Sequence, residues 1–267
     1  MKRILSGLII GIIVFVVLLF GNIYVVDVFL GLMALISIKE LYDVLKKKKY
    51  HPIKWIGYLV SIGICFLHVV PSDYLYAYIS ALVMLSVILL FITTIVKYRK
   101  VSIGDIAVTI LGICYIDLMI IFISLIRALD NGKYLVWYLF ICAWATDIFA
   151  LVFGILFGKH HFTAVSPKKT IEGCIGGAVM AIVAMTIYTV VINKTIGLNI
   201  NVGWIALVSL FISLIGQIGD LAASVIKRYA KVKDYGNLIP GHGGMLDRID
   251  SLLFIAPVTY FCLLFLI

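Results

Sequence analysis

The run SVIKRYAKVKDYGNLIPGHGGMLDRID, residues 224–250, concentrates charge within an otherwise apolar chain. It contains five Lys or Arg, three Asp and a His flanked by glycines, and apolar stretches lie on both sides. Glycine-rich backbone can direct successive N–H groups toward one anion. The run lacks the GK[ST] ending of a P-loop. Its composition therefore predicts a pocket of another kind for a phosphate-rich ligand, at the depth of the lipid headgroups.

A polar stripe leads into this run along a predicted helix. Its members are spaced by four, three and four residues, which places them on one helix face: Asp220, Ser224, Lys227 and Lys231. From membrane depth to the surface, the stripe offers a carboxylate, a hydroxyl and two cations. This order suits a metal-bound polyphosphate whose charged end reaches the interface. In the structural alternative, Asp220 pairs with Lys227 or Ser224 and closes the end of the helix.

Two more carboxylates, Asp247 and Asp250, flank Arg248 where the last apolar stretch begins. We expect Asp220 and Asp247 on two helices that form a hairpin, where both can bind a hard cation. Magnesium is the usual partner of carboxylates and phosphates together. Asp250 is a weaker third ligand, because a carboxylate at the start of a helix can simply cap it.

A second segment with polar chemistry is WATDIFALVFGILFGKHHFTAVSPKKTIEG, residues 144–173. Asp147, Gly154 and Gly158 are spaced by seven and four residues, so they share a helix face. Small residues on that face let another backbone approach closely. We therefore expect Asp147 to face other helices, either in a functional role or in a hydrogen bond with a neighbour.

The SPKKT part of this segment indicates an anion site. Ser166 followed by Pro167 is typical of an N-cap with proline at the first helical position. Lys168 and Lys169 then fall in the first turn, where the helix dipole disfavours cations. A bound phosphate would resolve this conflict. The alternative is that both lysines serve membrane topology alone.

The composition is that of a polytopic membrane protein. Of 267 residues, 64% are hydrophobic and 13% are charged, whereas soluble domains average about 25% charged residues. Nine apolar stretches predict transmembrane helices, at about residues 4–20, 23–41, 55–71, 74–96, 105–126, 134–157, 174–193, 204–224 and 251–267. We expect an all-α fold, with five membrane helices in residues 1–130 and four, with the polar loops of the site, in residues 131–267.

Lysine and arginine alternate between the two sides of this arrangement. The N-terminus and the connections after the even-numbered helices hold 19 of them, and the other connections hold 3. The positive-inside rule then places the N-terminus and both polar segments in the cytoplasm. Topology thereby explains the net charge of +9, and we expect no nucleic-acid partner.

Other candidate residues are fewer. Asp27 and Asp117 lie inside apolar stretches, where a carboxylate is costly and is a functional candidate by default. Each could instead end its apolar stretch or accept a hydrogen bond from a neighbouring helix. The five cysteines are scattered without a CxxC pair, so neither zinc nor a disulfide framework is expected.

Residues 224–250 closely resemble the signature of the phosphatidate cytidylyltransferase (CDP-diacylglycerol synthase) family. The matching positions are Ser224, Lys227, Arg228, Lys233, Asp234, Gly236, Leu238, Pro240, His242, Gly243, Gly244, Asp247, Arg248 and Asp250. SPKKTIEG is also similar to the family's other cytoplasmic motif. The resemblance implies that CTP and phosphatidic acid react to give CDP-diacylglycerol and pyrophosphate. It further implies an enzyme of the bacterial inner membrane whose site faces the cytoplasm.

The resemblance also implies roles for the candidate residues. Asp220 and Asp247, with Asp250 as a third candidate, are expected to bind Mg²⁺; a second cation beside it is left open. Phosphate contacts are expected from Lys227, Arg228, Lys231 and Arg248, and contacts to the lipid phosphate or pyrophosphate from Lys168 and Lys169. Hydrogen bonds are expected from Ser166 and Ser224 and from the backbone of His242, Gly243 and Gly244. CTP and phosphatidic acid are the expected partners, and a homodimer is left open.

Two other functions, a CDP-alcohol phosphatidyltransferase and a transporter, would leave different marks in the sequence. A CDP-alcohol phosphatidyltransferase would carry a DG…AR…G…D…D pattern, which the chain lacks. A transporter could use Asp27, Asp117 and Asp147 to carry an ion. It would not need the phosphate-binding loop, however, and the chain shows no inverted repeat.

The charge asymmetry predicts which loops face outward. Single cysteines at Lys47 and Lys169, introduced without the native cysteines, should react with a membrane-impermeant thiol reagent after the cells are opened. Cysteines at Asp73 and Asn131 should react in intact cells, because their connections belong to the lysine-poor side. Labelling of position 47 but not of position 73 in intact cells would reverse the arrangement.

Overall fold

The computed structural model describes residues 2–163, 165–238 and 243–265, with the backbone alone for residues 2–10. The chain forms two compact units. The first unit comprises Met1–Ala128 and Tyr229–Arg248, and the second comprises Leu129–Arg228 and Ile249–Ile267. The last part of the polar run, Tyr229–Arg248, thus belongs with the N-terminal helices.

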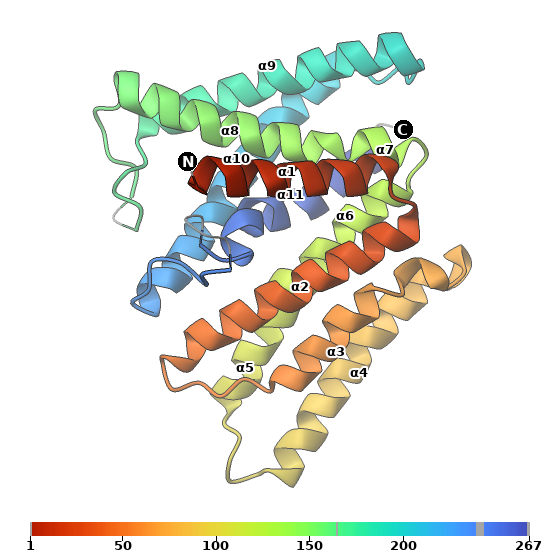
Figure 1. The fold of residues 1–267 in the computed structure, drawn as a ribbon, viewed down its shortest axis with the longest axis vertical. Coiled ribbons are helices and arrows are strands. Elements are labelled where there is room, and N and C mark those ends of the chain that lie inside the picture. The colour runs from red at the N-terminus through yellow and green to blue at the C-terminus, as the bar shows by residue number, and fades with distance from the viewer. Residues whose placement is uncertain (1, 164, 239–242, 266–267) are drawn as a thin grey trace. The chain divides into compact units, whose positions relative to one another are not determined.

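Every element formed by the described residues is helical (Figure 1). The α-helices are α1 (Lys2–Phe20), α2 (Ile23–Lys46), α3 (Lys54–Ile64), α4 (Leu75–Val96), α5 (Ile103–Gly112), α6 (Leu118–Ala128), α7 (Gly132–Leu135), α8 (Trp137–Phe157), α9 (Ile171–Ile196), α10 (Val202–Tyr229) and α11 (Leu246–Leu264). Two 3-10 segments, η1 (Leu67–Val69) and η2 (Ser72–Tyr74), lie between α3 and α4, and a π-helix, η3 (Ile113–Asp117), joins α5 to α6.

Five helical stretches are long and apolar enough to cross a membrane. They are Ser72–Val96, Ile103–Ala128, Gly132–Phe157, Ile171–Ile196 and Val202–Tyr229. The prediction of a helical membrane protein is confirmed at this level. α3 has 11 residues, which correspond to about 16 Å of helical rise against about 30 Å of hydrocarbon core. The full set of nine crossings stays a prediction.

In the first unit, α2 lies alongside α3, and α3 lies alongside α4 (Figure 1). Tyr42 of α2 occupies the space left by two glycines. A Cβ atom at Gly57 of α3 or at Gly112 of α5 would lie 2.7 Å from the Tyr42 hydroxyl. That hydroxyl donates to the carbonyl oxygen of Thr109 at 2.8 Å. One buried tyrosine therefore joins α2 to two other helices.

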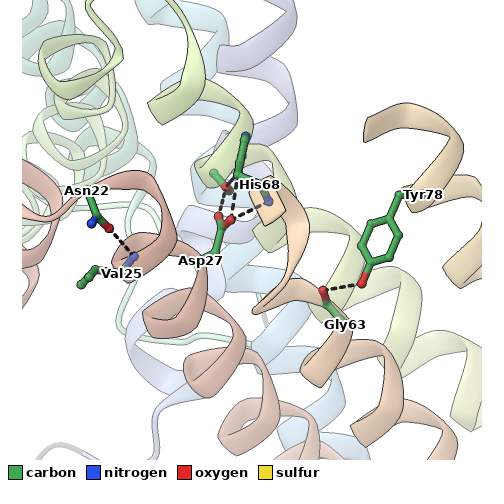
Figure 2. Close-up of polar contacts among 7 residues, drawn as sticks. Asn22, Val25, Asp27, Gly63, His68 and Tyr78 are labelled. Atoms are coloured by element: carbon green, nitrogen blue, oxygen red, sulfur yellow. Dashed lines mark hydrogen bonds and ion pairs between the residues drawn. The ribbon is translucent and has the colours of Figure 1, made fainter. Parts of the chain in front are cut away.

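The two carboxylates inside apolar stretches both accept hydrogen bonds from neighbouring elements. Figure 2 shows Asp27 of α2 beside His68, whose Nδ1 and backbone nitrogen lie 2.9 and 3.0 Å from Asp27 Oδ2. The hydroxyl of Ser124 in α6 donates to the other oxygen of Asp27. Asp117 of η3 accepts a hydrogen bond of 2.7 Å from Ser61 of α3. Both residues thus make the hydrogen bonds of the structural alternative.

In the second unit, α8 and α9 pack along their length (Figure 1). A Cβ atom at Gly177 would lie 2.6 Å from the carbonyl oxygen of Thr146, and one at Gly173 would lie 3.2 Å from the Cα atom of Gly154. The glycines therefore allow backbone to approach backbone. Gly154 thus meets another helix as expected, whereas the expectation that Asp147 faces other helices is wrong, because its side chain is exposed.

The predicted helix start at Ser166–Pro167 is wrong, because α9 begins at Ile171. Its N-cap is Thr170, whose hydroxyl accepts the N–H of Gly173 at 3.1 Å. A cap at Thr170 places Glu172 in the first turn, where the helix dipole favours an acidic side chain, and leaves the two lysines outside the helix. The first turn of α9 therefore contains neither lysine, and the argument for a bound anion from lysines within that turn does not apply.

The two competing caps differ in a way that stability can measure. Thr170→Ala should lower the free energy of unfolding by about 1 kcal/mol, because it removes the side-chain acceptor for an otherwise unpaired helix N–H. Thr170→Ser keeps the hydroxyl and should restore most of this loss, and Ser166→Ala should change little. Thermal unfolding of the purified protein in detergent measures all three. A larger loss for Ser166→Ala than for Thr170→Ala would return the cap to Ser166.

Candidate functional site

Two glycines bring α10 and α11 close together in the second unit. A Cβ atom at Gly216 would lie 2.6 Å from Cδ1 of Ile255, and one at Gly219 would lie 3.0 Å from the carbonyl oxygen of Asp250. Asp220 directly follows Gly219. This glycine contact therefore places the first carboxylate of the polar stripe at the level of Asp250.

Asp250 is buried among other charged groups. The negative charges of Asp220 and, more weakly, Asp147 repel its carboxylate, and the positive charge of Lys227 attracts it. Lys227 Nζ lies 4.0 Å from Asp250 Oδ2, and Oδ1 accepts the N–H of Ser251 at 2.8 Å. Carboxylates of α8, α10 and α11 thus act on one another here, and their mutual repulsion favours the binding of a cation.

The alternative role of Asp250 as a helix cap is wrong. α11 begins at Leu246 and carries Asp247 in its first turn, so Asp250 lies in the second turn. A side chain there is past the N–H groups that a cap satisfies. Asp250 remains a candidate ligand by its position beside Asp220.

Lys169 forms an ion pair with Asp220. It also lines a cavity of about 190 Å³ with polar side chains of α8, α10 and the segment before α9. The polar residues of this lining are Asp147, Lys168, Lys169, Thr170 and Gln217. The two lysines predicted to contact an anion and the carboxylate predicted to face other helices therefore line one cavity.

The segment between α8 and α9 folds back on itself, which positions these lysines. The N–H of Phe162 donates to the carbonyl oxygen of Lys169 at 2.9 Å. Glu172 closes the base of this turn, since its Oε1 lies 2.7 Å from His160 Nδ1. Glu172 thus joins the start of this segment to the first turn of α9.

The polar stripe of α10 is shorter than predicted. Asp220, Ser224 and Lys227 share the helix, which ends at Tyr229. Lys231 lies beyond this end in a left-handed conformation with φ of 57°, so its place on the stripe was wrong. The residues after Tyr229 contain neither Gly nor Pro until Gly236, so no local signal marks the end of the helix. Arg228 Nε donates to the carbonyl oxygen of Val165 at 3.4 Å, beside the lysine segment.

Residues 230–245, the glycine-rich loop, join α10 to α11. In the first unit, Asp247 connects two described parts of this loop. Its Oδ2 accepts the N–H of Tyr235 at 2.8 Å and that of Gly244 at 3.0 Å. Gly243 has a left-handed φ of 85°, and a Cβ atom there would lie 2.9 Å from Asp247 Oδ2. The Gly244 N–H, which was expected to contact phosphate, donates to Asp247 in this state.

His242 lies outside the described residues. Arg248 is exposed, next to Asp247 at the start of α11. Asp220 and Asp247 belong to different units, and their convergence on one metal ion stays a prediction.

The carboxylates of the candidate site suit a hard cation to which the protein supplies only one or two ligands. The described ranges contain no group of three or more His, Cys, Asp or Glu side chains that could hold a metal. Magnesium does not need such a cage, because one or two carboxylates and the phosphates of a substrate commonly hold it. Asp220 and Asp250 are two carboxylates of the second unit that lie near enough to repel each other.

Sequence reasoning missed Glu40 of α2. It accepts hydrogen bonds from the N–H groups of Met245 and Leu246, at 3.0 and 2.9 Å. No local pattern marks a partner 205 residues away. It also missed the cap at Thr170, although a threonine just before an acidic first turn could have revealed it.

Comparison with known proteins gives one consistent result. The model of the cytidylyltransferase family matches residues 1–266. A phosphatidate cytidylyltransferase of Bacillus subtilis (strain 168) is 32% identical over 98% of this chain and 97% of its own length. Phosphatidate cytidylyltransferases of Staphylococcus haemolyticus and Staphylococcus aureus (strain COL) are each 34% identical, over 86% and 94% of both chains respectively. The similarity covers both units.

Proposed function

Because the chain belongs to the cytidylyltransferase family, it transfers the cytidylyl group of CTP to phosphatidate, and we propose that Asp220, Asp247 and the surrounding basic residues perform this transfer. The products are CDP-diacylglycerol and pyrophosphate. One observation carries the assignment of the site. Carboxylates and lysines that the sequence singled out for phosphate chemistry meet as ion pairs in the second unit, at Lys169–Asp220 and Lys227–Asp250.

These ion pairs suit a site where phosphate groups replace carboxylates as the partners of the lysines. Without substrate, each lysine neutralises a carboxylate that would otherwise repel its neighbours. When phosphate groups and a divalent cation arrive together, the lysines can turn to phosphate and the carboxylates to the cation, so no charge is left unpaired. The cavity lined by Lys168 and Lys169 offers a place for the lipid phosphate or the pyrophosphate.

The reaction needs no covalent enzyme intermediate. An oxygen of the phosphatidate phosphate attacks the α-phosphorus of CTP, and the bond from that phosphorus to the pyrophosphate oxygen breaks. The nucleophile is already an anion, so the chain has to hold two polyanions together and neutralise the charge that develops. Lys227, Arg228 and Arg248 are the residues that we assign to this neutralisation, with Ser166, Ser224 and Lys231 as further contacts.

A magnesium ion, when bound, would supply positive charge to the phosphate oxygens. Asp220 and Asp247 would hold it, with Asp250 as a third candidate. The second unit supports the part played by Asp220, because its partner Lys169 is a flexible side chain that can be displaced. We leave a second cation beside the magnesium ion open.

We further propose that nine helices cross the inner membrane of a bacterium and that the N-terminus and the site face the cytoplasm. The charge split of 19 to 3 supports this orientation. The relatives named above come from bacteria, and CTP is a cytoplasmic nucleotide. A site on this side would receive CTP from water and phosphatidate from the bilayer.

Asp220→Asn and Asp247→Asn should each lower turnover on the order of a thousandfold, because each removes an anionic ligand from the ion that stabilises the transition state. The double variant should be little worse than either single variant, since ligands of one ion act as a unit. Incorporation of radioactive CTP into lipid by the purified proteins, over a range of magnesium concentrations, measures this loss.

The control for these variants is Asp130→Asn, which neutralises an exposed carboxylate in the loop after α6. It should keep wild-type turnover, and all variants should insert and purify equally well. If Asp220 were purely structural, its variant would give a low yield with normal specific activity. Near-wild-type turnover of purified Asp220→Asn at ordinary magnesium would refute the metal assignment.

The family also predicts the choice of nucleotide. CTP and dCTP should support turnover with phosphatidate, and ATP should not, because the base must be distinguished at its hydrogen-bonding edge. Initial rates with each nucleotide at equal concentration measure this preference. Comparable rates with ATP and CTP would contradict it.

A further inference from the structure

Glu40 of α2 lies against the start of α11 within the first unit. Its two carboxylate oxygens accept separate hydrogen bonds, Oε1 from the N–H of Met245 at 3.0 Å and Oε2 from the N–H of Leu246 at 2.9 Å. The first N–H groups of a helix have no partner within the helix. A carboxylate from a distant part of the chain therefore satisfies the beginning of α11 and interacts well with its dipole.

Two glycines of the loop make room for this carboxylate. A Cβ atom at Gly236 would lie 2.9 Å from Glu40 Cδ, and one at Gly244 would lie 2.6 Å from the same atom. Both distances are too short for an alanine unless Glu40 moves. The loop thus closes around Glu40 from two sides, at positions eight residues apart in the sequence.

Glu40 and Asp247 divide the N–H groups at this helix start between them. Asp247 accepts from Gly244, and Glu40 accepts from the next two residues. The two carboxylates are near enough to repel each other. The orientation of Asp247 therefore depends on a backbone that Glu40 holds, and a change at Glu40 reaches Asp247 through Gly244 and Met245.

We propose that Glu40 is a positioning residue for the reaction: it fixes the glycine-rich loop and the start of α11 so that Asp247 is correctly oriented. Glu40 does not touch the reacting atoms in this role. The proposal rests on the function assigned to Asp247 above. It also makes a claim about the loop that can be tested without nucleotide or metal.

Glu40→Gln keeps the size of the side chain but replaces one acceptor oxygen with an NH₂ group that cannot accept from an N–H. Hydrogen exchange, followed by mass spectrometry on the full-length protein in detergent without CTP or magnesium, should be faster in peptides that cover residues 243–247. The magnesium concentration for half-maximal turnover should rise about 10- to 100-fold, as expected when a residue supporting a metal ligand is lost. Asp43→Asn, on the same helix, is the matched control and should change neither value.

Gly236→Ala tests the same contact between Glu40 and the start of α11 without altering any charge. Its methyl group should push the Glu40 carboxylate away from the helix start, so it should raise the magnesium requirement as Glu40→Gln does. In a Glu40→Ala background, where the carboxylate is absent, Gly236→Ala should have little further effect. Independent, additive losses from the two substitutions would overturn the proposal.

The failure of this proposal is distinguishable from failure of the metal assignment. Unchanged amide exchange in Glu40→Gln overturns the positioning role, whatever Asp247 does. A lower melting temperature with wild-type magnesium dependence and turnover also overturns it, because the role is then purely structural. Wild-type turnover of Asp247→Asn would overturn the metal assignment and, with it, the role of Glu40 in the reaction, while faster amide exchange in Glu40→Gln would still show that Glu40 fixes the start of α11.

Discussion

Carboxylates inside this fold take hydrogen bonds or ion pairs from distant segments, and much of the structure follows from how each one does so. Apolar surroundings offer no water to satisfy an ionised group. Asp27 takes its donors from His68 and Ser124, and Asp117 takes one from Ser61. Glu40 takes two backbone N–H groups at the start of α11. Each contact joins segments that are far apart in the sequence, so the acidic side chains connect the helices of the first unit.

In the second unit, two carboxylates form ion pairs with lysines. Asp220 and Asp250 lie where glycines let α10 and α11 approach, and each has a lysine beside it. Such pairs differ in kind from the contact of Glu40, which accepts from two backbone N–H groups. A lysine side chain is flexible and can exchange one anion for another, whereas a backbone N–H is fixed. Asp220 and Asp250 therefore lie beside donors that can be displaced, whereas Asp247, the other proposed ligand, accepts from two backbone N–H groups.

The sequence predicts the features that repeat along the chain. The apolar stretches predict helices, and the helical membrane protein is confirmed in that form. The spacing of Asp147 and Gly154 predicts a close helix contact, and Gly173 of α9 makes it. The signature in residues 224–250 predicts the family, which the comparisons confirm. Periodicity and fixed spacing are local signals, and local signals are what a single sequence contains.

Three features could not be predicted from the sequence: a choice between two competing helix caps, a helix end without a local signal, and a contact between residues far apart in the chain. Ser166 and Thr170 are both good caps, and the choice between them depends on which first turn suits the helix dipole. The end of α10 before Lys231 has no local breaker to mark it. The partner of Glu40 follows it by 205 residues, at a distance where helical periodicity carries no information.

The chain leaves the second unit at Arg228, contributes Tyr229–Arg248 to the first unit, and then returns. This path has a consequence for biosynthesis. The helices of residues 1–128 emerge from the ribosome long before the segment that completes their unit. At ordinary rates of translation, Glu40 waits about 10 to 40 s for a partner that is 205 residues away. During this interval its carboxylate must remain hydrated or in contact with the insertion machinery. The first unit therefore begins to assemble first and is among the last parts of the chain to be completed.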